Sequence, residues 1–509
     1  MMKITRTTKM KIRAALVFVI LLCMNGRVLA ENIVDTANKD WLELVRQNLS
    51  SDTKSDLSDN FSKSEIDYKW ERLVKDYEKS PETFSRNSKS SEAEILSEWW
   101  ETLGDETLTG LIAKTFEANR SIQAARAKVL EARARAGVVK SNFQPKVTGT
   151  GRYTNGVKSY VEEGVSYNDH YIGMDASWEL DFFGRNKHAL DAAKATLDAE
   201  YADLHNAWCS LSAEVAMNYV NLRILQNRLA VARKNMKIQQ DILDILESQY
   251  NAGLKDALAV QQQKYTLEQT SAAIPAIEQS MHEVMSTISL LTGEIPGSRN
   301  ELLERYAEIP EVDVKRLIGI PAHAIRQRPD IRAAERRLAA QYSTRKSAEK
   351  NLYPSISLAG SIGLESLSIG NLFTSDAFSY LIGPRINIPI FNAGEIRKNI
   401  EVQSAVEEQL AAALEEVILQ AVKEVHDALT ANAQEFVRND TLKKALASAS
   451  DALFLARDKY DHGLTDFSNV LLAQQALYSA EDEYISSKGK EILNLIALFK
   501  SLGGGWMPL

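Results

Sequence analysis

An uninterrupted helix-forming stretch dominates the sequence. The 66 residues from Asn186 to Asn251 contain neither proline nor glycine, and apolar residues recur in them every seventh position apart from one four-residue step. The series is Leu190, Leu197, Leu204, Leu211, Val215, Leu222, Leu229, Met236, Leu243 and Tyr250. This spacing predicts a helix that packs lengthwise against other helices, with the supercoil relaxed at the step. It would be about 100 Å long, and because it carries charges throughout, we predict a rod in water and not a membrane span.

The sequence also contains two copies of one unit. Matching pairs, first half before second, are YNAGLKD (250–256) and YDHGLTD (460–466), Gly184 and Gly394, NRSIQAAR (119–126) and RPDIRAAE (328–335), and Pro145 and Pro354. The offset between partners is 209 or 210 residues throughout. A near-constant offset indicates a duplication, and two copies of this length do not form a solenoid. We assign the first repeat to residues 98–295, a connector marked by prolines to 296–320, and the second repeat to 321–507.

The N-terminus has the pattern of an export signal. A basic region is followed by an apolar run of 11 residues, Ala14 to Met24, and by a small-residue cleavage site at Ala30. Such a run is too short to span a bilayer as a helix. We therefore predict a signal peptide at 1–30, with acylation of Cys23 as the alternative. The polar segment 31–97 is expected to form an irregular N-terminal arm.

Further helices are expected beside each rod. Apolar residues at helical spacing predict helices at about 107–142 and 329–351, ahead of the strands described next. After the rods, the chain is expected to turn at a tip and return as helices at 257–292 and 467–502. The second rod, by equivalence with the first, is expected at 395–461.

The apolar period changes from that of a helix to that of a strand after Pro145 and again after Pro354. We predict two strand pairs, at about 146–182 and 355–391, each joined by a polar loop. An apolar face opposite a polar face fits either a soluble sheet with one wet side or a transmembrane barrel with water inside. The export signal and the aromatic residues at the strand ends favour the barrel. Four strands are too few to enclose a pore, so several chains are needed, and a homotrimer would supply twelve strands.

Composition and motifs argue against several classes of function. The net charge is −8 at pH 7 and no basic patch is dense enough for nucleic acid. The seven histidines are scattered, and no motif has the spacing of metal ligands or of a phosphate-binding glycine loop. Two cysteines do not make a disulfide framework. We therefore expect no catalytic residues, no metal and no cofactor.

Several segments resemble signatures of one group, the NodT-like outer-membrane efflux proteins of the TolC and OprM family. The segments are ASWELDFFGR (176–185), RQRPDIRAAERRLAAQ (326–341), LYPSISLAGSIG (352–363), IGPRINIPIFNAGEIRKN (382–399) and ALFKSLGGGW (497–506). They occur in the order typical of the family, and the resemblance covers about residues 95–507.

The resemblance implies a mostly α fold with a membrane β-barrel, in which a unit of helix, two strands, long helix and returning helix is duplicated. It implies a homotrimer whose twelve-stranded barrel in the outer membrane of a Gram-negative bacterium continues as an α-helical tunnel through the periplasm. The implied partners are outer-membrane lipid, a periplasmic adaptor (membrane fusion) protein and an inner-membrane pump, usually of the proton-driven RND type. The implied function is the passive exit duct of a tripartite efflux pump that expels drugs or other small toxic compounds.

In this family the two helix–turn–helix tips close the tunnel and meet the adaptor. The matching residues are Gly253, Leu254 and Asp256 in the first tip and Gly463, Leu464 and Asp466 in the second. The glycines are also what a helix end in the left-handed conformation requires. That requirement alone does not explain the paired leucines and aspartates, so we predict that both tips contact the adaptor.

One departure from the family concerns the gate of the tunnel. Relatives commonly place a carboxylate six or nine residues after the second tip glycine. Here those positions hold Asn469 and Leu472, and the first half has Ala259 and Gln262. An acidic ring is therefore not expected, although Asp466 would give a mild cation preference. The candidate constriction residues are Asn469, Leu472, Gln262 and Asp461.

Charged residues on the polar face of the predicted strands are candidates for the barrel lumen. They are Asp175, Glu179, Asp181 and Arg385. The alternative is that the acids pair across strands with Arg152 or Arg385. Two alternative functions are the channel of a type I protein-secretion system, which differs in partner, and a soluble periplasmic coiled-coil scaffold, which would lack the strand pairs.

Overall fold

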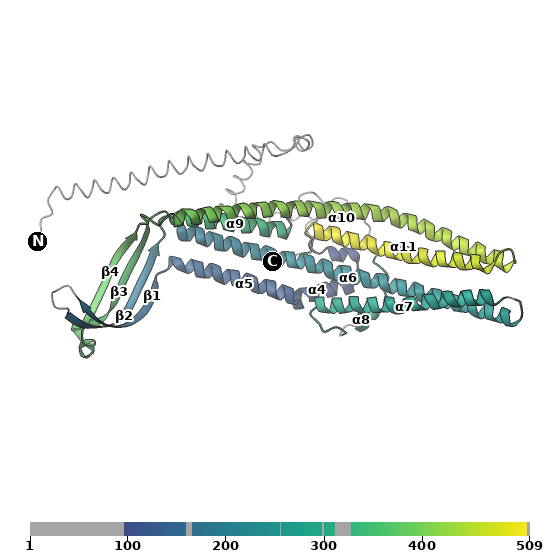
Figure 1. The fold of residues 1–509 in the computed structure, drawn as a ribbon, viewed down its shortest axis with the longest axis horizontal. Helices are drawn as coiled ribbons and strands as arrows, with labels where there is room; N and C mark the ends of the chain where they lie inside the picture. The colour runs from purple at the N-terminus through teal and green to yellow at the C-terminus, as the bar shows by residue number, and fades with distance from the viewer. Residues whose placement is uncertain (1–95, 159–164, 255, 298–299, 311–326, 506–509) are drawn as a thin grey trace, which may run out of the picture. The chain divides into compact units, whose positions relative to one another are not determined.

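The computed structural model describes residues 96–158, 165–254, 256–297, 300–310 and 327–505, which all belong to one compact unit, Ser90–Leu509. The predicted signal peptide, almost all of the predicted arm and much of the connector lie outside the described residues. The principal elements, in chain order, are η2 (Trp99–Leu103), α4 (Glu106–Ala118), α5 (Arg120–Lys140), β1 (Lys146–Lys158), β2 (Val165–Leu180), α6 (Arg185–Asn251), α7 (Ala257–Leu291), α8 (Asn300–Glu304), α9 (Pro329–Lys350), β3 (Ser355–Ser366), β4 (Phe378–Asn387), α10 (Glu395–Asp461) and α11 (Phe467–Ser501). Figure 1 shows the strands at one end of the long helices and the turns α6–α7 and α10–α11 at the other.

The two rods are α6 and α10, and each is 67 residues long. Both start directly after a glycine in the left-handed conformation, Gly184 with φ 81° and Gly394 with φ 85°. At this point the chain leaves the strand and bends into a helix that runs away from the sheet (Figure 1), a bend that glycine adopts without steric cost. Helix α6 packs against α5, α7, α9 and α11, whereas α10 packs against α9 and α11.

The helix expected at about 107–142 is interrupted. Asn119 has φ −64° and ψ 131°, so α4 ends before it and α5 begins after it. Its side-chain oxygen accepts hydrogen bonds from the amides of Ser121 (2.8 Å) and Ile122 (3.2 Å), while its amide group donates to the carbonyl of Leu291 (2.9 Å). This cap satisfies the free N–H groups of α5 and fixes the break against the end of α7.

The four strands form one antiparallel sheet in the order β1-β2-β3-β4. Strands β2 and β3 come from different halves of the chain and pair with Trp178 opposite Leu358. This pairing leaves β1 and β4 as edge strands, and β4 accordingly tolerates Pro384, which has no N–H to donate. The strands end at Leu180 and Asn387, earlier than the predicted 182 and 391. The reason at β4 is Pro389, two residues on, which again removes a donor.

The two faces of the sheet differ in polarity. By register, one face carries Thr148, Thr150, Arg152, Asp175, Glu179, Ser357, Ser361, Glu365 and Arg385. The opposite face carries exposed apolar side chains, which are Val147, Tyr153, Ile172, Met174, Ile362, Tyr380, Ile382 and Ile386. A large exposed apolar surface on a sheet indicates a lipid or protein contact, and its alternation with polar residues is typical of a membrane barrel.

The main hydrophobic core lies where α4, α6, α7 and α11 meet, around Trp99, Tyr219, Ile288 and Phe499. The ring of Trp99 stacks on Phe499 with a centroid separation of 5.2 Å. The C-terminal glycines lie against the same tryptophan, and a Cβ added at Gly505 would stand 2.4 Å from the Ser212 hydroxyl. The motif LGGG thus packs the end of α11 onto the middle of α6, because only glycine fits this approach. Among the described helices, none has a segment that is both long enough and apolar enough to cross a bilayer.

Candidate functional site

Each tip is a tight helix C-cap followed by a new helix. At the first tip Gly253 has φ 75° and the Leu254 amide donates to the carbonyl of Gln249 at 2.9 Å; at the second, Gly463 has φ 68° and the Leu464 amide donates to that of Lys459 at 2.8 Å. This is the Schellman arrangement. It pushes the leucine outward, so Leu254 is 73% and Leu464 76% exposed. Each tip therefore presents an uncovered leucine at the end furthest from the sheet (Figure 1).

The two tip aspartates are not equivalent. Asp256 caps α7, and its carboxylate accepts a hydrogen bond from the amide of Ala259 at 3.2 Å. Asp466 occupies the same position at α11 but makes no side-chain cap, and its carboxylate is exposed. Four residues before it, His462 donates its Nδ1–H to the carbonyl of Asp458 (2.7 Å); this bond and the carboxylates of Asp458 and Asp461 raise the pKa of His462.

The candidate constriction residues lie just beyond the tips. Asn469 and Leu472 are exposed on α11, and Asn469 donates from its side chain to the Thr465 hydroxyl at 2.7 Å. Gln262 is half-buried on α7, and Asp461 is exposed at the end of α10. The other sides of these helices meet in a small core, where Leu246, Val260, Phe467 and Leu471 join the two hairpins. Asn469 and Leu472 thus face away from this core.

The three acidic lumen candidates bind groups other than Arg152 and Arg385, which were their partners in the alternative prediction. The carboxylate of Asp175 accepts from the Thr150 hydroxyl at 2.5 Å, and Arg152 pairs instead with Asp169 at 3.1 Å. Asp181 follows the end of β2 and accepts from the amide of Lys187 at 2.7 Å, so it caps the start of α6. A carboxylate is favourable at a helix N-terminus. Glu179 is described below.

Arg385 stands opposite Ser357 on the edge strand β4 and is exposed. In the described part of the chain it makes no ion pair. Its position on the polar face, next to an open edge, leaves its guanidinium available to water.

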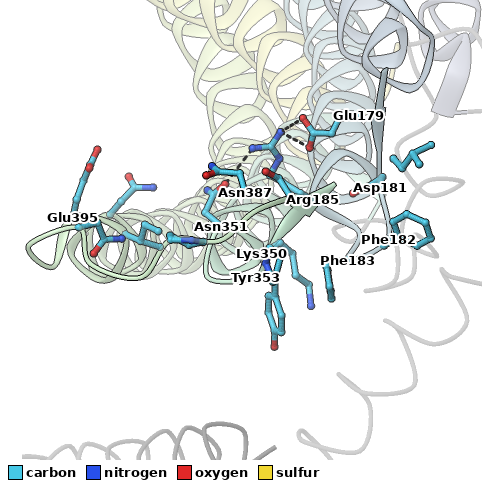
Figure 2. A pocket seen from close by; sticks show the side chains of 17 residues that line it. Glu179, Asp181, Phe182, Phe183, Arg185, Lys350, Asn351, Tyr353, Asn387 and Glu395 are labelled. Atoms are coloured by element: carbon cyan, nitrogen blue, oxygen red, sulfur yellow. Dashed lines mark hydrogen bonds and ion pairs between the residues drawn. The ribbon is translucent and has the colours of Figure 1, made fainter. Parts of the chain in front are cut away.

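A pocket lies at the junction of the sheet and the helices (Figure 2). On its polar side Arg185, the first residue of α6, binds both oxygens of Glu179 at 2.6 Å and reaches Asn351 at 3.5 Å. Elsewhere in Figure 2, Lys350, Tyr353 and Phe183 lie together, away from this pair. The sequence analysis gave no role to Arg185, although it ends the segment 176–185, or to Lys350, since their partners come from other elements.

A second set of residues that sequence reasoning missed ties the first repeat to the connector near the core. Arg223 is buried in α6 and donates to Tyr219 (2.8 Å), to Gln226 (2.7 Å) and to the carbonyl of Arg305 (2.7 Å). Tyr219 in turn donates to Asp105, the cap of α4. A buried guanidinium must be hydrogen-bonded to be tolerated, and a polar residue in a heptad series is the signal that could have revealed it.

Two titratable groups of α6 are strongly perturbed by burial. Burial raises the pKa of the Cys209 thiol to about 12, with a smaller contribution from Asp330. Burial, and then the charge of Arg332, lowers the pKa of His205 to about 4. Both groups are therefore neutral at pH 7. Among the described residues, neither is placed as one member of a nucleophile and base pair. Within the described residues, no group of three or more His, Cys, Asp or Glu side chains is placed to hold a metal ion.

Comparisons with known proteins agree with this geometry. The family described as Outer membrane efflux protein matches residues 111–294 and 320–504, once for each half of the chain. Nodulation protein T of Rhizobium leguminosarum bv. viciae is 28% identical over 427 residues, which are 84% of this chain and 88% of that protein. The cation efflux system protein CusC of Escherichia coli O6:H1 is 27% identical over 80% of this chain and 88% of its own length. The solved structure of the outer-membrane channel OprN matches with a TM-score of 0.77 and 29% identity, over 82% of this chain and 97% of that one.

The duplicated family match, the long helical hairpins and the sheet with one apolar and one polar face lead to one conclusion. The resemblance inferred from the motifs is confirmed, as are the mostly helical fold with its barrel strands and the outer-membrane location. Members of the family are channel proteins that work in efflux pumps together with an adaptor and an inner-membrane transporter. The chain belongs to the outer membrane efflux protein family, and it is the outer-membrane channel of an efflux pump in a Gram-negative bacterium.

Proposed function

We propose that three copies of this chain close into one duct, in which twelve strands line a pore in the outer membrane and six rods surround a tunnel in the periplasm. The observation that carries the proposal is the pair of open sheet edges, β1 and β4. Unpaired edge strands expose a row of N–H and C=O groups that lipid cannot satisfy. Pairing β4 of one copy with β1 of the next removes every edge, and three copies reach the strand number at which a barrel has an interior.

The surface of α10 supports the same assembly. Its buried series Leu414, Ala421 and Ala428 faces α9 and α11. One residue further along, about 100° around the helix, Val422, Leu429 and Phe436 recur with the same spacing but are exposed. We call these three residues the α10 stripe. A heptad series of apolar residues is the seam of a helix–helix contact, so the α10 stripe is the contact with the neighbouring copy.

The tips are the surface for the periplasmic adaptor, a membrane fusion protein. In the assembled duct Leu254 and Leu464 alternate around the periplasmic end, six exposed leucines beside the tip aspartates. Such a ring can receive an adaptor helix pair that offers small apolar residues and a basic flank. The partner at the inner membrane is a proton-driven pump of the RND type, which loads small toxic compounds into the duct; the channel itself acts passively.

The tunnel is narrowest at Leu472 and Asn469, whose side chains face away from the core that joins the hairpins. Without an acidic ring at that level, Asp466 supplies the negative charge at the mouth, three times in a trimer. A small ring of like charges attracts cations and repels anions, an effect that salt screens. In the barrel, Asp175, Glu179 and Arg385 line the wet side.

The assembly is tested with full-length protein extracted from outer membranes. Native mass spectrometry should give a mass of three chains, and insertion into a planar lipid bilayer should give discrete conductance steps. A detergent-free monomer that does not conduct would overturn the proposal.

Asp466→Asn should reduce the preference for cations measured by reversal potentials in a salt gradient, whereas Asp451→Asn, an exposed change within α10, should not. Equal cation selectivity of Asp466→Asn and the wild type would mean that Asp466 does not lie at the mouth of the tunnel.

A further inference from the structure

The junction between sheet and helices contains exposed aromatic rings. Phe182 and Phe183 follow β2, Tyr353 precedes β3, and all three are exposed. Next to them the apolar face of the sheet begins with Trp178 and Ile356. Membrane proteins place aromatic side chains at the level where hydrocarbon gives way to lipid headgroups. Because the rods extend into the periplasm, this junction marks the periplasmic leaflet of the outer membrane.

Two of these rings, Phe183 and Tyr353, form one surface together with the side chain of Lys350. The rings of Phe183 and Tyr353 stack with centroids 5.2 Å apart and planes 18° apart. The ammonium of Lys350 lies 5.3 Å from the centre of the Tyr353 ring, and Figure 2 shows it extending beside both rings. The stack joins the two halves of the chain, since Phe183 belongs to the first repeat and Tyr353 to the second.

Among the described residues, no carboxylate pairs with the Lys350 ammonium. Neighbouring cations have carboxylate partners: Arg185 binds Glu179 at 2.6 Å, and Lys346 binds Glu349 at 3.2 Å. Lys350 has no such ion pair with any described residue. Burial, and then the charge of Lys350, lower the pKa of His188, with Lys187 and Lys346 adding to the effect and Asp191 opposing it.

We propose that Lys350, Tyr353 and Phe183 bind one glycerophospholipid of the periplasmic leaflet, with its phosphate at the Lys350 ammonium and its glycerol and acyl chains along the two rings and the apolar face of the sheet. An anion satisfies the free ammonium, and the acyl chains cover the aromatic and aliphatic surface. A free phosphate would leave that surface exposed to water, which is why a lipid is the better occupant. The site rests on the outer-membrane location of the chain and not on the number of copies in the duct.

The duplication limits this site to one per chain. At the offset of 209 residues that relates Pro145 to Pro354, the positions of Lys350 and Tyr353 hold Ser141 and Gln144 in the first half. The helix α5 does end in Lys140, with Phe143 three residues on, as α9 ends in Lys350 with Tyr353 three residues on. The position equivalent to Phe183 holds Asn392 or Ala393 at either offset, so no second ring completes the stack at the other junction. The expected stoichiometry is therefore one tightly held lipid for each polypeptide.

The test uses full-length protein in detergent and counts retained lipid by native mass spectrometry. Phosphatidylglycerol is the probe, and a diacylglycerol with the same acyl chains, which lacks the phosphate, is compared with it. The wild type should retain one phosphatidylglycerol per chain in preference to diacylglycerol. Lys350→Met should weaken retention roughly fivefold, as expected for one basic residue at an anionic lipid, and Phe183→Leu with Tyr353→Leu should weaken it further. Lys264→Met, an exposed lysine on α7 remote from the sheet, should leave it unchanged.

Three results would overturn the proposal. Equal retention of diacylglycerol and phosphatidylglycerol would mean that the phosphate is not recognised. Displacement of the lipid by millimolar inorganic phosphate would mean a free-anion site, and wild-type retention by Lys350→Met would mean that this residue is not the ligand. Circular dichroism and bilayer conductance of each variant show whether it is folded, so that a loss of lipid is separated from a loss of the channel.

Discussion

Removing the apolar atoms of the α10 stripe should dissociate the trimer. Val422, Leu429 and Phe436 are 48%, 51% and 55% exposed in the single chain. Since full burial of such a side chain is worth about 1.5–3 kcal/mol, covering the exposed half contributes about 1 kcal/mol each. Leu429→Ser with Phe436→Ser then removes about 2 kcal/mol from each contact and about 6 kcal/mol from three contacts. The association constant of the trimer should fall roughly ten-thousandfold.

Sedimentation velocity in detergent, measured over a range of protein concentrations, reports the populations of monomer and trimer. Leu290→Ser with Phe373→Ser removes the same two side-chain types from exposed positions on α7 and in the β3–β4 connection, and should leave the trimer intact. Far-ultraviolet circular dichroism checks that the rods of both variants are helical. A trimer that is equally stable in the stripe variant and in this control would refute the assignment of the contact to α10.

The perturbed groups of α6 give two further predictions. The folded state holds His205 neutral with a pKa of about 4, below the ordinary value of 6.5, so stability is fully present above pH 6.5 and is lost as the pH falls towards 4. Thermal melts between pH 7 and pH 4 should show this loss, and His205→Gln should reduce it; an unchanged pH profile would contradict the burial of the imidazole. The Cys209 thiol, with its pKa raised to about 12, should resist labelling by a maleimide at pH 7.5 until the protein unfolds. Rapid labelling of the folded protein, followed by mass spectrometry, would show that α11 and the C-terminal glycines do not cover it.

The regular parts of the fold were readable from the sequence because each depends on a local period. The heptad series placed the first rod at 186–251, and α6 spans Arg185–Asn251. The constant offset then placed the second rod, and the strand alternation identified which face of the sheet is apolar. The tips were equally accessible, because Gly253 and Gly463 mark left-handed helix ends that few other residues tolerate.

The parts that the sequence could not supply depend on contacts between distant elements. Asn119 breaks a helix because its side chain can reach both the amides of Ser121 and Ile122 and the carbonyl of Leu291, which is 172 residues away. Asp181 was assigned to the strand by parity, although it caps α6. The lipid surface at Lys350 is another case, since its rings come from both repeats. Residues at the ends of elements have no period, so their partners appear only in three dimensions.

The duplication also predicts how one copy meets the next, because each contact between the two halves should recur between chains. Strand β2 pairs with β3 so that the residue numbers of partners sum to 536, as for Trp178 and Leu358. Adding 210 to a residue number in β2 gives the equivalent residue of β4, and subtracting 209 from a residue number in β3 gives the equivalent residue of β1. Partners in β4 of one copy and β1 of the next should therefore have residue numbers that sum to about 537. Ile386 should then lie opposite Gly151, and both belong to the apolar face of the sheet, as the alternation requires.

This register can be tested by forming a disulfide between chains. Directly opposed residues on antiparallel strands have Cα atoms about 4.5–5.5 Å apart, within the range of a disulfide. Ile386→Cys with Gly151→Cys should therefore link into a covalent trimer under mild oxidation, while the buried Cys209 stays out of the reaction. Ile386→Cys with Thr150→Cys places the thiols on opposite faces and should not link. If the second pair crosslinks and the first does not, the strands are offset by one residue. The equivalence of contacts within and between chains then fails, because a one-residue shift would place the apolar residues of β4 beside the polar residues of β1.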